Sequence, residues 1–171
     1  MKSKSAVLKR RELDFDFRNA SWGMTKSDVK YSEGIQPHSE SENYVTYREK
    51  VMGLDAVIGF HFNDGYLVRA GYAFREFRGD EADYIEEYEK VKGMLTSVYG
   101  EPEVDENLRE KTSLCDSQTP SCDDLDDRDT IMLLSQWLTG RSIVRLILMG
   151  CNEGCDFGVL YITRDHDDSV K

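Results

Sequence analysis

The folded part of the chain opens with the stretch Phe17-Arg18-Asn19-Ala20-Ser21-Trp22-Gly23-Met24-Thr25-Lys26-Ser27-Asp28-Val29. Thr25 is a good N-cap, because its hydroxyl can accept a hydrogen bond from an amide of the first helical turn. Asp28 lies three residues further on, where a carboxylate can accept from the N-cap amide and complete a capping box. Gly34 suits the position just after a helix. The stretch therefore predicts an extended segment that turns into a helix over residues 25–33.

Trp22 and Gly23 stand directly before this helix. A glycine allows the sharp turn that the change of direction needs. Large aromatic side chains at such junctions usually pack on the core, and we expect this role for the indole of Trp22. The alternative is a flat platform on which a ligand stacks.

A second helix is predicted between Asp80 and Tyr99. Its apolar residues recur at helical spacing and form one continuous stripe, which consists of Tyr84, Tyr88, Val91, Leu95 and Val98. Gly100 suits the position after the helix, and Pro102 prevents its continuation.

Six strands are predicted from apolar and alternating runs at residues 44–52, 56–62, 66–74, 130–138, 141–149 and 157–163. Asp14 to Phe17 alternates and suits an edge strand, whereas residues 101–129 have no clear period and suggest a long acidic loop that carries cysteines. The order is helix and three strands, twice. It predicts an α+β fold of two layers, with a mostly antiparallel sheet of two meanders and helices packed on one face. It also allows a weak internal duplication.

The length fits one domain, which we place at residues 14–164, between a flexible basic arm at 1–13 and a polar tail at 165–171. The net charge is −11, and the five basic residues of the arm leave the rest of the chain more acidic still. Nucleic acid is therefore an unfavourable partner. No apolar run reaches the ~20 residues of a membrane span. We expect a cytoplasmic protein, or a periplasmic or lipid-anchored one if a leader has been removed.

Four cysteines form two sequence pairs, Cys115 with Cys122 and Cys151 with Cys155. In a reducing compartment free thiols are the default, and no cofactor is then needed. Four thiolates could instead hold zinc, although six residues between Cys115 and Cys122 exceed the usual two to four. Two disulfides are the third alternative. A metal- or redox-responsive domain follows if the four sulfur atoms converge.

Further landmarks recur in order along the chain: Trp22-Gly23-Met24-Thr25 with Val29, Tyr99-Gly100-Glu101-Pro102, Trp137, and Val159-Leu160-Tyr161-Ile162. In these the chain resembles a loose set of bacterial proteins with a WG-x-S/T helix start and a YG-x-P helix end. It is also similar to the outer-membrane-assembly lipoprotein domain and to the helix-plus-sheet repeat of the beta-lactamase-inhibitor protein. The resemblance implies a binding or assembly module without catalysis.

No nucleophile elbow, P-loop, dinucleotide fingerprint or HExxH motif occurs in the chain. We therefore expect a non-catalytic module whose partner is a protein, rather than an enzyme. The free face of the sheet is the expected contact surface, because aromatic side chains suit interfaces. Its candidate residues are Tyr44, Tyr47, His61 and Tyr72.

Overall fold

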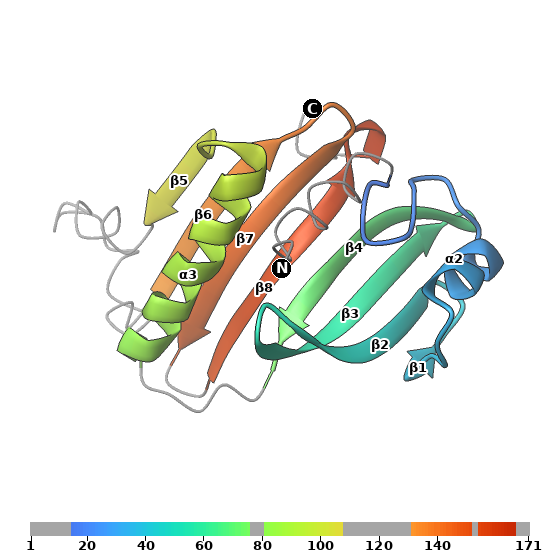
Figure 1. Cartoon of the computed structure of the whole chain (residues 1–171), viewed down its shortest axis with the longest axis horizontal. Helices are drawn as coiled ribbons and strands as arrows, with labels where there is room; N and C mark the ends of the chain where they lie inside the picture. Colours follow the sequence, from blue (N-terminus) through green and yellow to red (C-terminus); the bar gives the residue numbers. More distant parts are fainter. Residues whose placement is uncertain (1–14, 76–80, 108–130, 152–153, 167–171) are drawn as a thin grey trace, which may run out of the picture.

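The computed structural model describes residues 15–75, 81–107, 131–151 and 154–166. These residues form one sheet and two α-helices (Figure 1). In chain order the elements are α2 (Lys26–Glu33), β1 (Ser39–Glu40), β2 (Tyr44–Val51), β3 (Leu54–Asn63), β4 (Tyr66–Phe74), α3 (Glu81–Tyr99), β5 (Val104–Asn107), β6 (Ile131–Leu138), β7 (Ser142–Cys151), β8 (Gly154–Thr163) and the 3₁₀ turn η2 (Arg164–His166). The eight described strands make a single open, antiparallel sheet of order β1-β2-β3-β4-β8-β7-β6-β5. The predicted α+β class is confirmed.

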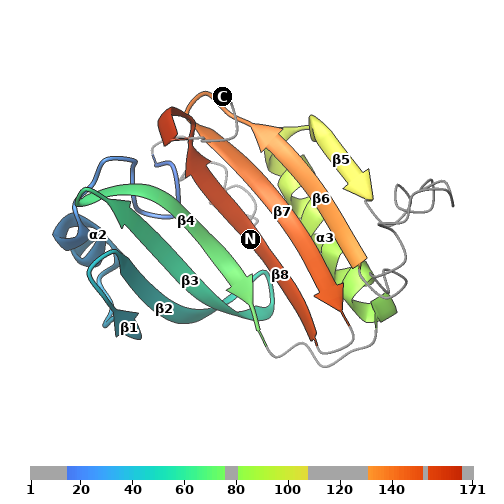
Figure 2. The same ribbon diagram turned by 180° about the vertical axis from the view of Figure 1, so that it is seen from behind.

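The order of elements repeats along the chain as one helix followed by four strands, twice. The last strands of the two repeats, β4 and β8, pair at the centre of the sheet, and the first strands, β1 and β5, lie at its two edges (Figure 2). The prediction of three strands per repeat was therefore one strand short in each half. The missing strands have two and four residues and mostly polar side chains, so they carry no apolar alternation by which to recognise them.

The other predicted elements need two corrections. Residues 101–129 are not loop throughout, because β5 lies within them and pairs with β6. Phe17 belongs to a tight turn rather than an edge strand, and its one bridge is to Ala20. The chain reverses there because Arg18 adopts a left-handed φ of 54°. The predicted arm at 1–13, residues 108–129 of the loop, and the tail from residue 167 lie outside the described residues.

The start of α2 is the predicted capping box. Oγ1 of Thr25 accepts from the Asp28 amide at 3.3 Å, and Oδ2 of Asp28 accepts from the Thr25 amide at 3.1 Å. Gly34 ends the helix with a left-handed φ of 67°, a conformation that costs glycine nothing.

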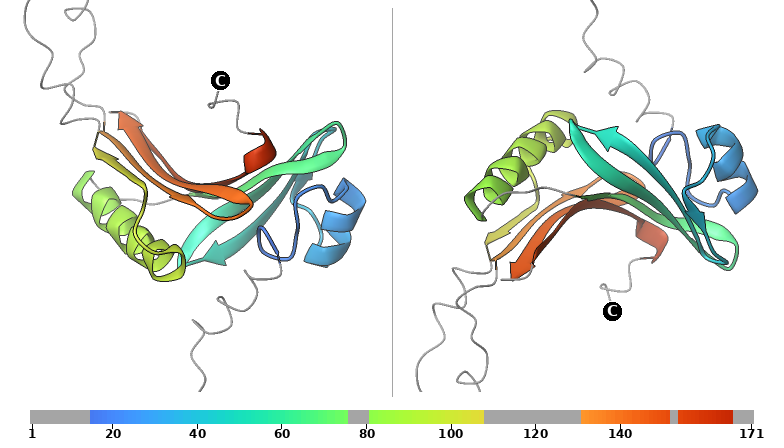
Figure 3. Two further views of the ribbon diagram at one scale, coloured as in Figure 1. Left: turned by 90° about the horizontal axis from the view of Figure 1, so that it is seen from above. Right: turned by 90° about the horizontal axis from the view of Figure 1, so that it is seen from below.

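The two faces of the sheet follow from the strand registers, because side chains alternate between faces along each strand. One register row consists of Val45, Phe60, Ala70, Tyr161, Val144 and Trp137. All six are buried, and we call the face that they share the helix face. In edge view the sheet is an arch with α2 and α3 on its outer side (Figure 3). The helix face is therefore convex, and the opposite face is concave.

Two groups of side chains cover the helix face. The ring of Phe17 lies with its centroid 5.4 Å from that of Phe60 and 4.9 Å from that of Tyr161. On the other half of the sheet, α3 contributes Tyr88, whose ring lies 6.4 Å from Phe157. The predicted stripe of α3 is thus a core stripe, with Tyr88, Val91 and Leu95 at its buried centre.

Candidate binding surface

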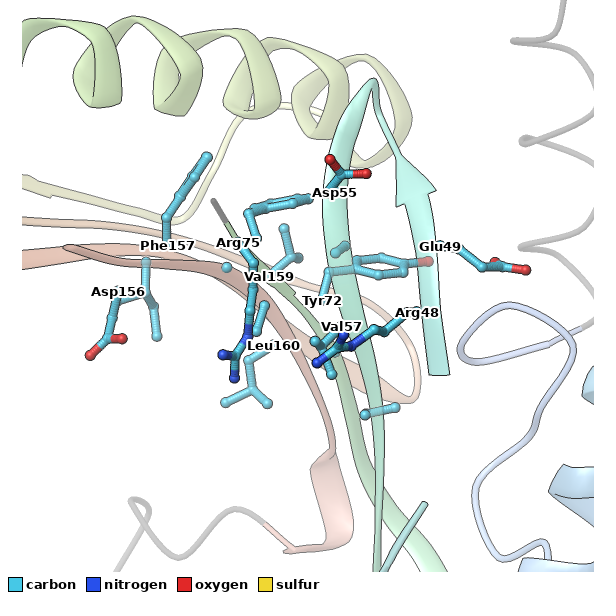
Figure 4. A pocket seen from close by; sticks show the side chains of 18 of the residues that line it. Arg48, Glu49, Asp55, Val57, Tyr72, Arg75, Asp156, Phe157, Val159 and Leu160 are labelled. Atoms are coloured by element: carbon cyan, nitrogen blue, oxygen red, sulfur yellow. The ribbon is translucent and has the colours of Figure 1, made fainter. Parts of the chain in front are cut away.

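The concave face is the part of the sheet that neither α2 nor α3 covers. The residues of β2, β3, β4, β8, β7 and β6 that point to it are Tyr44, Thr46, Arg48, Lys50, Asp55, Val57, Gly59, His61, Arg69, Gly71, Ala73, Arg75, Asp156, Gly158, Leu160, Ile162, Ile143, Arg145, Ile147, Met149, Met132, Leu134, Gln136 and Leu138. The guanidinium groups of Arg48 and Arg75 extend to this side, away from α3, as do the side chains of Val57 and Leu160 (Figure 4).

The half formed by β2, β3 and β4 is basic. Arg48 and Arg75 are exposed, and Arg69 is half-buried. None of the three has a carboxylate partner among the residues that the structure describes. Lys50, the fourth basic residue, pairs with Asp55 at 3.3 Å. The positive charges of these three arginines are therefore not balanced by an ion pair with any described carboxylate.

Elsewhere in the described chain, most basic side chains do have a carboxylate partner. Those that pair are Arg18, Lys30, Lys90, Lys92 and Arg141. Lys26 and Arg164 donate to main-chain carbonyl groups instead. In a chain with 33 acidic and 22 basic residues, acidic partners are plentiful. Arg145, on the other half of the concave face, donates to Gln136. Among the basic residues that the structure describes, Arg48, Arg69 and Arg75 thus differ from the majority, which pair with carboxylates.

Tyr44 and His61 form an aromatic pair at the end of the basic half where β2 begins. They face each other in the β2–β3 register, with ring centroids 4.6 Å apart and planes inclined by 35°. Arg69 is the next residue across, opposite His61 on β4. Tyr44 is 50% exposed, so part of its ring is available to solvent, two strands away from Arg69.

The half formed by β8, β7 and β6 carries mostly apolar side chains on its concave side, together with Asp156, Arg145 and Gln136. Leu160, Ile147 and Leu134 are half-buried there, and Met149 is 44% exposed. A sheet face in contact with water normally carries polar side chains opposite a buried apolar face. These strands carry apolar side chains on both faces. Exposed apolar surface of this kind is typical of a sheet face that packs against another protein.

Glycines lie where the two halves meet. Gly71 on β4 and Gly158 on β8 flank the central strand pairing, and Gly59 lies beside Gly71 on β3. A Cβ added to Gly71 would lie 2.5 Å from the carbonyl oxygen of Val159, and one added to Gly158 would come as close to the carbonyl oxygen of Tyr72. The strands therefore approach there more closely than any side chain permits. At Gly71 and Gly158 the floor of the concave face is main chain, whereas Leu160 and Ala73 stand opposite them across the seam.

A cavity of about 1080 Å³ lies against this seam. Arg48, Gly59, Gly71, Gly158 and Leu160 are among its lining residues. Its lining also includes residues of the helix face, such as Tyr72, Phe74 and Phe157, and Tyr84 of α3. The cavity is therefore an open groove along the seam and not a closed pocket.

Two of the four predicted aromatic candidates are on the wrong face. Tyr47 is completely buried on the helix face, and Tyr72 lies opposite Ile58 on the same face, against Phe17. Tyr44 and Tyr47 are three residues apart in one strand, and an odd spacing places two side chains on opposite faces. Alternation alone could have separated them. Tyr44 and His61 do lie on the concave face, and their role in binding stays a prediction.

The arginines of the concave face were missed in the sequence. Arg48 follows the buried residues Val45 and Tyr47 in β2, at a position of opposite parity. Arg69 alternates with buried residues of β4, and Arg75 comes directly after the last residue of that strand. Period-2 alternation could have placed each of them opposite the core. Their gathering on one surface could not have been found in this way, because it depends on which strands are neighbours.

A polar cluster on the helix face binds three segments together. The guanidinium of Arg18 contacts Glu33 of α2 at 3.1 Å and Glu49 of β2 at 2.7 Å. Burial would lower the pKa of Arg18, but the neighbouring carboxylate of Glu33 and the hydrogen bond to Glu49 outweigh it, and the pKa is raised. Since the Glu33 side chain is fully enclosed, this cluster holds α2 and the Phe17 turn to the sheet rather than facing a ligand.

A serine, an aspartate and a tyrosine are linked under α3. Oγ of Ser135 lies 2.7 Å from the hydroxyl of Tyr88 and donates to Oδ1 of Asp105 at 2.8 Å. Lys92 pairs with the other oxygen of Asp105. Ser135 is completely buried, so a substrate cannot reach its hydroxyl. The network satisfies buried polar groups and connects α3 to β5 and β6.

The cysteine hypotheses keep their three alternatives. Cys115 and Cys122 lie outside the described residues, and Cys151 is in β7. Cys155 is half-buried in β8 and packs against the core, in register with Gly150. No group of three or more His, Cys, Asp or Glu side chains in the described residues could hold a metal ion. Zinc, disulfides and free thiols stay predictions.

The landmark residues of the predicted resemblance have structural roles here. Trp22 packs on the core and donates to Ser142, and the buried Trp137 donates from Nε1 to the carbonyl of Gly100 at 2.8 Å. Gly100 has a φ of 88°, which ends α3 before Pro102. Tyr99 packs against the core beside Tyr161.

Comparison with protein-family models, with curated proteins and with solved structures found no match. The resemblance to the WG-x-S/T bacterial proteins, the assembly lipoprotein domain and the inhibitor protein therefore stays a prediction. Neither α2 nor α3 has the length and apolar character that crossing a membrane requires.

Proposed function

We propose that this protein is a non-catalytic binding module and that its concave face holds a protein partner. The observation that carries the proposal is that β6, β7 and β8 carry mostly apolar side chains on both faces, although only one face is covered by a helix. On the concave side, Ile147, Leu160 and Met149 present apolar surface that neither helix covers. Burying such surface against a partner is favourable by about 25 cal/mol per Å².

The rigidity of the surface supports the same function. Each of its central strands pairs on both sides, so its residues are held at fixed spacings before a partner arrives. A preorganised surface loses little conformational entropy on binding. Exposed aromatic and arginine side chains such as Tyr44 and Arg48 are types that are enriched in protein interfaces.

The test is affinity capture with the full chain from a lysate of its own cells, followed by binding of each captured protein in purified form. The surface variant is Leu160→Asp with Ile147→Asp, and the matched control is Tyr31→Asp with Met94→Asp, which changes two exposed residues of α2 and α3. We expect a purified partner to bind the wild type and the control but not the surface variant. Equal binding by all three proteins, with circular dichroism showing them all folded, would refute the proposal.

A further inference from the structure

The concave face is divided by chemistry along the seam between β4 and β8. On one side lie Arg48, Arg69 and Arg75, and on the other lie mostly apolar side chains such as Ile147 and Leu160, with Arg145 and Asp156 among them. Gly71 and Gly158 leave main chain uncovered at the seam between the two sides. A ligand that satisfied both sides would need anionic groups along one edge and apolar groups along the other.

The arginines favour carboxylates as the anionic groups. A guanidinium offers several donors in a planar fork that matches a carboxylate in two parallel hydrogen bonds. Within the molecule, carboxylates are the usual partners of described basic groups. A carboxylate from outside would complete the same pattern on the concave face.

The spacing favours an extended chain. Arg69 of β4 and Arg75, directly after β4, are six residues apart, or about 20 Å at 3.3 Å per residue of extended chain. Arg48 is two strands away from β4, or about 10 Å across the sheet. An extended segment of six to eight residues has this reach. Gly59 leaves open space where a side chain would stand, with no atom within 4 Å of an added Cβ, so the main chain of such a segment can approach the floor.

A nucleic acid fits this surface poorly. Its phosphates would meet the three arginines but also a chain of net charge −11, which repels a polyanion over the length of an oligonucleotide. The apolar half at Ile147 and Leu160 also has no counterpart in a phosphate backbone. A peptide alternates polar and apolar side chains at the spacing of a strand, and so can satisfy both halves together.

We propose that the concave face binds an extended, acidic segment of a partner protein, with carboxylates toward Arg48, Arg69 and Arg75 and apolar side chains toward Ile147 and Leu160. This inference rests on the proposed function and names the chemistry of the partner. It predicts an affinity that falls with ionic strength, because three of the contacts are between opposite charges at a partly exposed site.

The first experiment selects binders for the immobilised full chain from a displayed library of random twelve-residue peptides. We expect the selected peptides to be enriched in both acidic and apolar residues. Selected peptides without acidic enrichment would overturn the inference. If such peptides bound the wild type but not the Leu160→Asp, Ile147→Asp variant, the proposed function would stand and only the inference of an acidic partner would fall.

The second experiment titrates one selected peptide, labelled with fluorescein, by fluorescence anisotropy. Arg48→Gln with Arg75→Gln removes two exposed charges, and we expect a loss of affinity of about tenfold or more. Lys30→Gln with Lys90→Gln is the charge-matched control on α2 and α3, and we expect less than about a twofold loss there. Equal effects of the two pairs would contradict the inference. A twelve-nucleotide oligouridine that bound through the same two arginines would also overturn it.

Discussion

Nε1 of Trp22 donates a hydrogen bond of 2.9 Å to Oγ of Ser142, and the two residues are 120 positions apart in the chain. The bond joins the segment before α2 to the first residue of β7, and so connects the first helix–strand repeat to the second. Ser142 is buried, which makes a lost partner expensive.

We expect Trp22→Phe to lower the free energy of unfolding by about 1–2 kcal/mol, because the buried hydroxyl of Ser142 loses its donor. Urea denaturation measures the change. The control is a double-mutant cycle with Ser142→Ala, in which we expect a coupling energy of about 1 kcal/mol. Additive effects of the two substitutions would show that the bond contributes nothing.

The seam glycines lead to a second prediction. Gly71→Ala and Gly158→Ala each place a Cβ against a carbonyl oxygen of the neighbouring strand. We expect each to lower stability by about 1–3 kcal/mol or more, since main chain cannot move aside as a side chain can. Gly59→Ala is the matched control, with no atom near its added Cβ, and thermal unfolding should separate it clearly from the other two. A similar loss for Gly59→Ala would contradict the explanation.

The Tyr88 hydroxyl supports a third prediction. Burial under α3 raises the pKa of Tyr88 to about 12, and its hydrogen bond with Ser135 only partly opposes the shift. The absorbance of tyrosinate should therefore rise by the same amount between pH 8 and about 11 in the wild type and in Tyr88→Phe. A smaller rise in the variant would mean that Tyr88 ionises in the ordinary range and is not enclosed.

Asp28 supplies a prediction about pH. The pKa of Asp28 is lower than its ordinary value of 3.8, because the carboxylate accepts hydrogen bonds from the hydroxyl and the amide of Thr25. A group whose pKa is depressed by folding stabilises the fold above its unfolded pKa, and this contribution disappears as the pH falls through the folded value.

We therefore expect Asp28→Asn to be less stable than the wild type at neutral pH, with the difference shrinking as the pH falls below 3.8. Urea denaturation across this range measures it. The same substitution is also made together with Thr25→Ala, which removes the hydroxyl that donates to Asp28. In that background the effect of Asp28→Asn on the free energy of unfolding should depend less on pH. A difference that stayed constant with pH would rule out the carboxylate as its source.

Features that depend on neighbouring residues could be predicted well. The capping box joins Thr25 to Asp28, and the left-handed glycine at 34 ends the same helix, so all of its determinants lie within ten residues. The tight turn at Asp64-Gly65 is similar, with φ values of 50° and 84°, and Asn63-Asp64-Gly65 is a sequence typical of such turns. Such features form through local hydrogen bonds and intrinsic backbone preferences.

The short edge strands could not be predicted, because β1 and β5 exist only through their partners. The sequence of β5 has no clear apolar alternation, and its extended conformation is held by main-chain hydrogen bonds to β6. Tyr72 shows the same limit for side chains. Its face depends on the register of β4 against β3, which a bulge at His61 and Phe62 shifts by one residue.

The sequence by itself determined the class of fold, the two helices with their ends, and the six long strands, because periodicity and caps act over a few residues. Only the tertiary structure decided that β4 and β8 are neighbours, and hence that the arginines of β2 and β4 lie across a glycine seam from the apolar residues of β7 and β8. Strand pairing joins residues nearly a hundred positions apart, and its register is chosen by the packing of the whole sheet against both helices. The candidate binding surface is a product of that pairing.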